Sequence, residues 1–210
     1  MSHSETFINE YSIQEKLTPR QMDYAWAHGW RHFGNYFFRY SIAGDKHIQH
    51  VVPLRIKLAD VQLSTSQKRV WRRNRDLNIK IRDAFIDDDK RALFDRHKTR
   101  FREHVPDQLS SFLGDEPAHI PCRTKEICLF KDVRLVAASF LDIGETSTSS
   151  IYAMFEPAES KRSLGIYLIL LSIKFSGRVL KKYYYTGYAY EESIRHNRLL
   201  EGILSASKKC

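Results

Sequence analysis

Apolar and polar residues alternate along several short segments in the first half of the chain, and this pattern predicts strands. Residues 50–61 place aliphatic side chains at every second position, which is the period of a half-buried strand. Pro53 within this segment favours a sheet edge or a bulge. The aromatic run 35–42 leads into Ala-Gly-Asp-Lys, which is typical of a hairpin, and residues 77–81 alternate again. We therefore expect a strand in each of these segments.

The second half of the chain is richer in strands. Residues 126–143 and 148–157 indicate three strands of an antiparallel meander, with a tight turn near Lys131 and Asp132. Residues 182–188, which are rich in tyrosine, indicate a further strand.

Helical spacing of apolar residues and the presence of capping residues predict helices between these strands. Pro19 suits the first turn of one helix through Trp26, and the hydroxyls of residues 64–66 can cap a second helix. The near-continuous apolarity of residues 163–176 indicates a helix that packs on a sheet face. A polar helix start with Ser163 as its cap is the alternative to an anion-binding turn at this position. Two more helices are expected, at 87–105 and 107–114.

Strands and helices in this order are typical of an α+β fold, an α/β sandwich in which helices flank a mixed sheet. We expect a loosely packed polar segment over residues 1–18 and a single domain over residues 19–205. The 42% content of hydrophobic residues suffices for a core, which excludes a disordered chain.

Charge points to a polyanionic partner. The 34 Lys and Arg residues exceed the 25 Asp and Glu residues, giving a net charge of +9. Residues 67–82 carry most of this excess, and a concentrated basic patch is a more specific nucleic-acid signal than a diffuse surplus.

Neither compartment signals nor metal motifs are evident. Cys122, Cys128 and Cys210 form no Cys-x-x-Cys pair and are expected to be free thiols in a reducing compartment. The start of the chain lacks a secretory pattern, and residues 164–173 are too short to span a bilayer, so we expect a cytoplasmic protein with no membrane contact. No metal site and no cofactor are expected, because His, Cys and carboxylates do not cluster and the usual nucleotide and hydrolase motifs are missing.

The basic helix is the first candidate site. A cap at Ser66 would place Lys68, Arg72 and Arg75 on one face and Arg69 and Arg73 on the next. Like charges at this spacing repel, so an anion, such as RNA, is favoured there, with Trp71 as a stacking partner for a base. The alternative is a solvated charged face.

Two further constellations carry polar groups suited to a ligand. Residues 159–167 place a basic Ser-Leu-Gly turn at a helix start, where free N–H groups can bind an anion. The last strand carries tyrosines on both sides of Gly187, and simple alternation predicts that Tyr184 and Tyr188 face one way and Tyr185 the other.

Taken together, these blocks resemble a known family. The stretch VPLRIKLADVQLSTSQKRVWRRNRDL at 52–77 is similar to the motif of the arginyl-tRNA–protein transferases and their leucyl-transferring bacterial relatives. SSIYAMFEPAESKRSLGIYLILLSI and KKYYYTGY resemble the later motifs of that family, in the same order. The resemblance extends over roughly residues 28–200.

The resemblance implies a core like that of GNAT N-acetyltransferases and transfer of an amino acid from aminoacyl-tRNA to the N-terminus of an acceptor protein, which marks that protein for degradation. It implies tRNA contacts by Lys68, Arg69, Arg72, Arg73, Asn74, Arg162, Ser163, Leu164 and Gly165. The stretch GDKHIQHVVPLR lacks the cysteines of many relatives, so an iron–sulfur cluster is not expected.

Positioning and oxyanion stabilisation can supply most of the acceleration, because aminoacyl-tRNA is already an activated ester. Candidate catalytic groups are Glu156, Asp142 and Tyr188, and Tyr152, Tyr185 and Gly187 are candidates for the aminoacyl or acceptor pocket. The carboxylates of the meander favour arginine as the transferred amino acid, with leucine as the alternative. A coenzyme A-dependent acetyltransferase and a non-catalytic RNA-binding protein are the competing functions.

Overall fold

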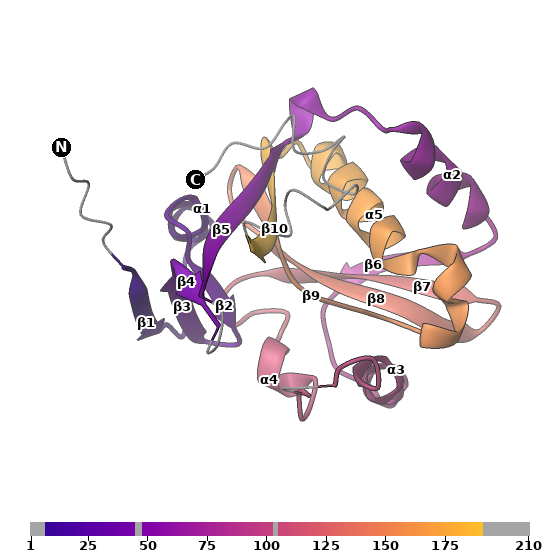
Figure 1. The fold of residues 1–210 in the computed structure, drawn as a ribbon, viewed down its shortest axis with the longest axis horizontal. Coiled ribbons are helices and arrows are strands. Elements are labelled where there is room, and N and C mark those ends of the chain that lie inside the picture. Colours follow the sequence, from indigo (N-terminus) through magenta and orange to yellow (C-terminus); the bar gives the residue numbers. More distant parts are fainter. Residues whose placement is uncertain (1–6, 45–47, 103–104, 191–210) are drawn as a thin grey trace.

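The computed structural model describes residues 7–44, 48–102 and 105–190 and is built around a seven-stranded sheet. Its strands follow the order β4-β5-β10-β9-β8-β7-β6 (Figure 1). Their bounds are Ile42–Ala43 (β4), Gln49–Lys57 (β5), Asn78–Asp83 (β6), Thr124–Lys131 (β7), Arg134–Ile143 (β8), Ser147–Phe155 (β9) and Tyr183–Tyr190 (β10).

The sheet is mixed because one pair of neighbours runs parallel. β9 and β10 pair in parallel, whereas the other neighbouring strands of this sheet pair antiparallel. The chain passes from β9 to β10 through the short 3-10 helix η2 (Pro157–Arg162) and the helix α5 (Leu164–Arg178). β10 is thereby inserted between β9 and β5, which lies far earlier in the sequence.

Helices cover both faces of the large sheet. α2 (Thr65–Arg73) and α5 lie on one face, while α3 (Asp88–Lys98) and α4 (Ser110–Leu113) lie on the other (Figure 1). Ile127 and Leu129 of β7 belong to the core on the α5 side, and Cys128, between them, belongs to the core on the α3 side. The central strands are apolar almost throughout because both of their faces are covered.

A smaller sheet, order β1-β3-β2, lies beside the large one. Its strands are Asn9–Ile13 (β1), Tyr36–Tyr40 (β3) and Arg31–Phe33 (β2), and α1 (Pro19–Ala27) packs on it through Met22 and Trp26. Part of the polar segment predicted over residues 1–18 forms β1, which pairs with β3 along its whole length while four of its five residues remain exposed.

Helix starts follow capping chemistry, with two differences from the prediction. Ser64, not Ser66, caps α2 and forms a reciprocal capping box with Gln67. Ser163 precedes α5 in the left-handed conformation (φ 55°) and makes no side-chain cap, so the alternative in which Ser163 caps this helix is wrong. The helices predicted at 87–105 and 107–114 are confirmed as the shorter α3 and α4.

The predicted α+β class, with a mixed sheet flanked by helices, is confirmed. Within the described ranges, no helix combines the length and apolarity needed to cross a membrane.

Candidate functional site

Two bulges face each other where β9 and β10 separate. The parallel pairing of these strands covers only Ser147–Ser149 and Tyr183–Tyr185. Just beyond it, the β8–β9 register skips Ile151, and the β5–β10 register skips Thr186. A bulge leaves a residue out of the ladder and frees its backbone groups, and bulges are frequent next to active sites. The point where β9 and β10 separate is therefore the candidate position for a functional site.

Cavities open on both sides of this separation, and Ser150 and Ile151 line both of them. The first, which we call the aromatic cavity, lies between β9, β10 and the small sheet and has a volume of about 480 Å³. The second, the α5 cavity, lies at the start of α5 and has a volume of about 680 Å³. Two molecules, one in each cavity, would meet at Ser150 and Ile151.

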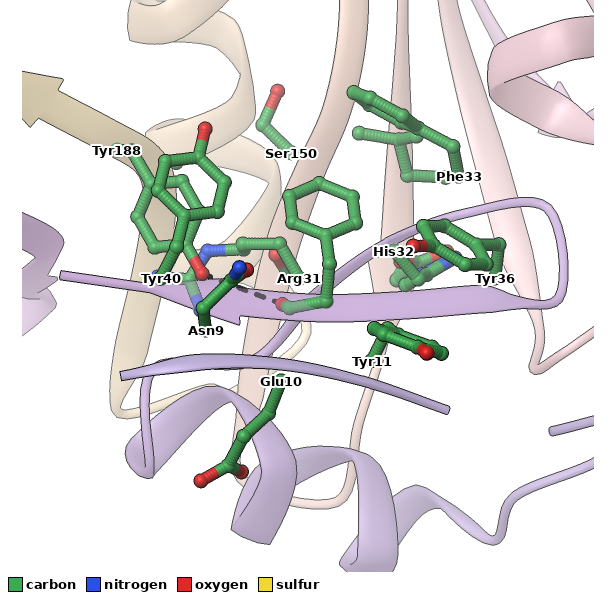
Figure 2. Close-up of a pocket in the computed structure, with 15 residues that line it drawn as sticks. Asn9, Glu10, Tyr11, Arg31, His32, Phe33, Tyr36, Tyr40, Ser150 and Tyr188 are labelled. Carbon is green, nitrogen blue, oxygen red and sulfur yellow. Dashed lines mark hydrogen bonds and ion pairs between the residues drawn. The ribbon is translucent and has the colours of Figure 1, made fainter. Parts of the chain in front are cut away.

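Aromatic rings make up much of the wall of the aromatic cavity, with a buried cation among them. Figure 2 shows Arg31 with Tyr188 and Tyr40 on one side and with Tyr36 and Tyr11 farther along the cavity. The Arg31 guanidinium lies 5.1 Å from the ring centroid of Tyr185 and 5.4 Å from that of Tyr188. Arg31 is 6% exposed, so its charge acts where water screens it little. The lining also contains two carboxylates, but Glu10 pairs with Arg39 and Asp142 pairs with His32. The part of the cavity beside Arg31 therefore suits an anionic group.

A buried hydrogen-bond chain forms the back wall of the aromatic cavity. Nε2 of His32 lies 2.6 Å from Oδ2 of Asp142, and Oγ1 of Thr124 donates to Oδ1 at 2.6 Å. Nδ1 of His32 lies 2.8 Å from the carbonyl oxygen of Gly34. A carbonyl only accepts, so Nδ1 carries a proton and a second proton lies between Nε2 and Asp142. The chain joins β2, β7 and β8 and holds the cavity wall in place.

Sequence reasoning selected Asp142 but missed His32. Asp142 lines the cavity, yet both of its oxygens are hydrogen-bonded and the residue is fully buried. His32 was missed because its partner lies 110 residues away. No local spacing relates the two residues.

The tyrosine side chains of β10 do not alternate between the two faces of the sheet as a regular strand would predict. Tyr184 packs against Ile173 of α5, while Tyr185 and Tyr188 both lie under Arg31 on the opposite face. The predicted shared face of Tyr184 and Tyr188 is wrong, because the bulge at Thr186 reverses the alternation. The Tyr188 hydroxyl donates to the carbonyl of Gly29 at 2.5 Å, and burial raises its pKa to about 12. Tyr188 thus remains a neutral donor at neutral pH.

Gly187 also lines the aromatic cavity, whereas Tyr185 is 2% exposed and lies behind Arg31. The positive φ of Gly187, 110°, is a backbone conformation that glycine adopts without a steric penalty, which explains glycine at this bulge.

Apolar side chains dominate the α5 cavity, and none of the described residues that line it is acidic. Ile166 and Ile169 of α5 lie in its wall, together with Phe155 of β9. Its cation is Arg100, whose guanidinium lies 4.3 Å from the ring centroid of Phe155. An apolar group fits this cavity, whereas a second cation would be repelled.

Three residues of the predicted Ser-Leu-Gly turn, Ser163, Leu164 and Gly165, line the α5 cavity. Leu164 is 1% exposed, so its side chain belongs to the core. At Gly165, a Cβ atom would lie 3.1 Å from the Phe155 ring, so glycine permits close packing of α5 on β9. The predicted Tyr152 also lines this cavity. It stacks on Phe112 at 4.2 Å, and burial raises its pKa to about 12.

Glu156 lines neither cavity. Its carboxylate accepts from Nε of Arg96 at 2.7 Å and lies 4.0 Å from Arg134. Arg162 likewise turns away from the α5 cavity, because it forms a two-pronged pair with Asp76 and also contacts Glu159. These ion pairs connect η2 to the neighbouring elements.

The predicted basic helix is confirmed as α2, but its polar residues differ in exposure. Lys68 and Arg72 are exposed and line a groove, and Arg69 is exposed elsewhere on the helix. Arg73 donates to the carbonyl oxygen of Lys161. Asn74 is fully buried and donates to the carbonyls of Val70 and Arg162, so its side chain holds α2 to η2 and lies inside the protein, away from any tRNA.

Comparison with known proteins identifies a protein family that this chain matches. The family described as "Arginine-tRNA-protein transferase, C terminus" matches residues 89–196. An aspartate/glutamate leucyltransferase of Hahella chejuensis is 31% identical over 166 residues, covering 76% of this chain and 68% of that protein. One of Acinetobacter baumannii is 30% identical, covering 80% of this chain and 62% of that protein. The chain thus spans about two thirds of the length of these relatives.

Solved structures share the fold at much lower identity. FemX is similar with a TM-score of 0.51 and 8% identity, covering 90% of this chain and 65% of that one. The C-terminal domain of a putative lysylphosphatidylglycerol synthetase from Agrobacterium fabrum has a TM-score of 0.50 and 14% identity, covering 86% and 54%. The similar structures also include a GCN5-related glucosamine N-acetyltransferase region, with a TM-score of 0.46 and 16% identity, covering 94% and 23%.

Proposed function

The chain belongs to the aminoacyl-tRNA–protein transferase family, and on this premise we propose that it transfers leucine from leucyl-tRNA to a protein N-terminus whose first residue is acidic. The observation that carries the proposal is the pair of cavities that meet at Ser150 and Ile151. The α5 cavity receives the aminoacyl end of the tRNA, and the aromatic cavity receives the acceptor.

Leucine is favoured over arginine by the lining of the α5 cavity. An arginyl side chain needs a carboxylate, because an unpaired buried charge costs several kcal/mol. Of the three carboxylates that supported arginine, Asp142 is engaged with His32 and Glu156 with Arg96. The third, Glu145, is exposed and lines neither cavity. Arg100 would repel a guanidinium, whereas Ile166 and Ile169 suit a leucyl side chain. The names of the similar leucyltransferases agree with this assignment.

An acidic first residue is favoured by Arg31. Its guanidinium is buried among tyrosines in the aromatic cavity, where a carboxylate of the acceptor would gain a charge-assisted contact. The paired His32 and Asp142 carry opposite charges or none, so Arg31 dominates the charge of the buried wall. The names of the leucyltransferases cite aspartate and glutamate.

The reaction needs positioning more than a dedicated nucleophile. The neutral α-amino nitrogen of the acceptor attacks the ester carbonyl carbon, and the bond from this carbon to the ribose oxygen breaks. The proton lost by the amine ends on that ribose oxygen, which leaves as a hydroxyl group. The unperturbed α-amino pKa is about 7.7–8.0, so part of the amine is already neutral near pH 7. Backbone groups freed by the bulge at Ile151 are placed to stabilise the developing oxyanion.

Within this scheme the predicted catalytic residues have different roles. Asp142 holds His32 and the cavity wall, and Tyr188 orients Arg31 as a neutral phenol. Glu156 fixes η2 beneath the α5 cavity through Arg96 and takes no part in proton transfer.

A direct transfer assay tests the function. The protein is incubated with leucyl-tRNA or arginyl-tRNA and with peptides that begin with Asp, Asn or Lys, and the products are identified by mass spectrometry. We expect leucine on the Asp peptide. Transfer from arginyl-tRNA alone would refute the leucine assignment, and acetylation by acetyl-coenzyme A would place the protein among acetyltransferases.

A further inference from the structure

A groove of about 570 Å³ lies between α2 and α5, apart from the two cavities of the transfer site. These helices pack side by side on the same face of the large sheet (Figure 1). Its floor is apolar and includes Trp71, Leu170 and Ile173. The Trp71 ring meets Tyr167 edge-on at 5.4 Å, so the core holds one edge of the indole while the residue remains partly exposed.

Four cations surround this apolar floor. Lys68, Arg72 and Arg75 belong to α2 and the residues just after it, and Lys174 belongs to α5. All four are exposed, and no carboxylate is among the described residues that line the groove. An apolar floor under an unopposed basic rim matches a ligand with a flat apolar part and a phosphate, which is the chemistry of a nucleotide.

Two rows of side chains on α5 connect the groove to the α5 cavity. Residues four apart share a face of a helix, so Ile166, Leu170 and Lys174 form one row, and Ile169 and Ile173 form a second. Ile166 and Ile169 line the α5 cavity, while the other members of the rows line the groove. The rise from residue 166 to residue 174 is about 12 Å. A single strand that leaves the cavity along α5 therefore reaches the groove within a few nucleotides.

We propose that this groove binds an unpaired nucleotide of the donor tRNA, next to its aminoacylated 3′ end; the proposal rests on the function proposed above. The base lies on Trp71 and the phosphate lies among the four cations. Nζ of Lys174 lies 4.6 Å from the Trp71 ring centroid, where the base displaces it toward the phosphate. A paired nucleotide presents only its backbone and would leave the apolar floor unused.

The test uses a short single-stranded RNA with the 3′-terminal sequence of tRNA, and a duplex with the same total number of phosphates. The indole N–H signals of Trp26, Trp30 and Trp71 in the ¹⁵N-labelled full chain report where the RNA binds. We expect the single strand to shift the Trp71 signal and to bind at least several-fold more tightly than the duplex. Stacking of about 1–3 kcal/mol per base predicts a loss of about 5- to 150-fold in Trp71→Ala.

Matched arginine variants separate the groove from general electrostatics. Arg72→Ala and Arg69→Ala remove the same charge from exposed positions of one helix, but only Arg72 lines the groove. We expect Arg72→Ala and Lys174→Ala to weaken single-strand binding about three- to tenfold and to lower the salt slope by about 0.7 each, while Arg69→Ala changes affinity less than twofold.

Equal losses in Arg72→Ala and Arg69→Ala, equal affinity for the duplex, or an unshifted Trp71 signal would each overturn the proposal. Leucyl transfer by the unmodified protein is measured separately. Transfer without groove binding refutes only the groove, and groove binding without transfer refutes only the proposed function.

Discussion

Replacing Arg31 by methionine is expected to abolish the preference for an acidic acceptor. Methionine keeps an unbranched stem between Tyr185 and Tyr188 but removes the charge that lies 5.1 and 5.4 Å from their rings. Arg31 is 6% exposed, so its contact with an acceptor carboxylate forms where little water competes. A charge-assisted hydrogen bond in such a place is worth about 1.5–3 kcal/mol. This corresponds to about 10- to 150-fold in kcat/KM.

A competition assay measures the preference for an acidic first residue separately from any general loss of enzyme activity. Two peptides that differ only in a first residue of Asp or Asn compete for leucine in one reaction, and the product ratio gives the ratio of their kcat/KM values. In Arg31→Met this ratio should fall about 10- to 150-fold. General damage to the enzyme slows both products equally and cancels in the ratio.

Arg39→Met is the matched control. Arg39 also lies over an aromatic ring, at 5.1 Å from the centroid of Trp30, and pairs with Glu10, but it does not line the aromatic cavity. Its product ratio should equal that of the unmodified protein. An unchanged ratio in Arg31→Met, with the melting temperature and the total transfer rate intact, would refute the assignment of Arg31 to the acceptor carboxylate.

Three further predictions concern stability. Asp142→Ala leaves His32 and Thr124 without their buried partner and should lower the free energy of unfolding by about 3–5 kcal/mol in urea titrations. Loss of the exposed Asp83, which pairs with Lys125, should lower it far less, and equal effects of the two substitutions would contradict a buried hydrogen-bond chain. Burial raises the pKa of Tyr188 and Tyr152 to about 12, so between pH 10 and 12 the folded state holds protons that the unfolded state has lost. Stability should fall with rising pH in that window, and less steeply in Tyr188→Phe; equal slopes in denaturant titrations would contradict this cause. Gly177→Ala meets no atom within 4 Å and should stabilise α5 by about 1 kcal/mol, while Gly165→Ala, whose Cβ meets Phe155 at 3.1 Å, should be about 1–3 kcal/mol less stable than Gly177→Ala by thermal unfolding.

The sequence predicted those secondary-structure elements that are determined by interactions between residues close together in the chain. The basic helix and the turn at Lys131 and Asp132 follow from short-range spacing and turn chemistry, and both are confirmed. The cap of α2 was predicted within residues 64–66, but the basic faces were assigned from Ser66 and the cap is Ser64. The bulge at Thr186 was not predicted. The cap shifts the assigned helix faces by two residues, because one hydrogen bond decides where the helix begins. The bulge reverses the side-chain alternation of the strand, because it inserts one extra residue.

The candidate site could be predicted only in part, because it is assembled from distant segments. Gly187, a pocket candidate by sequence, and Tyr188, a catalytic candidate, both line the aromatic cavity. Arg31 and His32 lie just before the aromatic run 35–42, and no motif in the sequence singled them out. Glu156 was a catalytic candidate and Asn74 a candidate tRNA contact by sequence, but both are buried and bonded to partners on other elements. Which partner a polar group finds depends on the tertiary fold.

The insertion of β10 between β9 and β5 has a consequence for the order of folding. β5 ends at Lys57, and its partner begins at Tyr183, so their pairing closes a loop of about 126 residues. At 5–20 residues per second, a ribosome needs roughly 6–25 s to make that stretch. β6, β7, β8 and β9 pair with near neighbours in sequence and can form a hairpin meander during this time. β10 is thus the last strand of the large sheet to be synthesised, and β5 can join the sheet only through it. A nascent chain can therefore bind neither substrate across the site until β10 has joined.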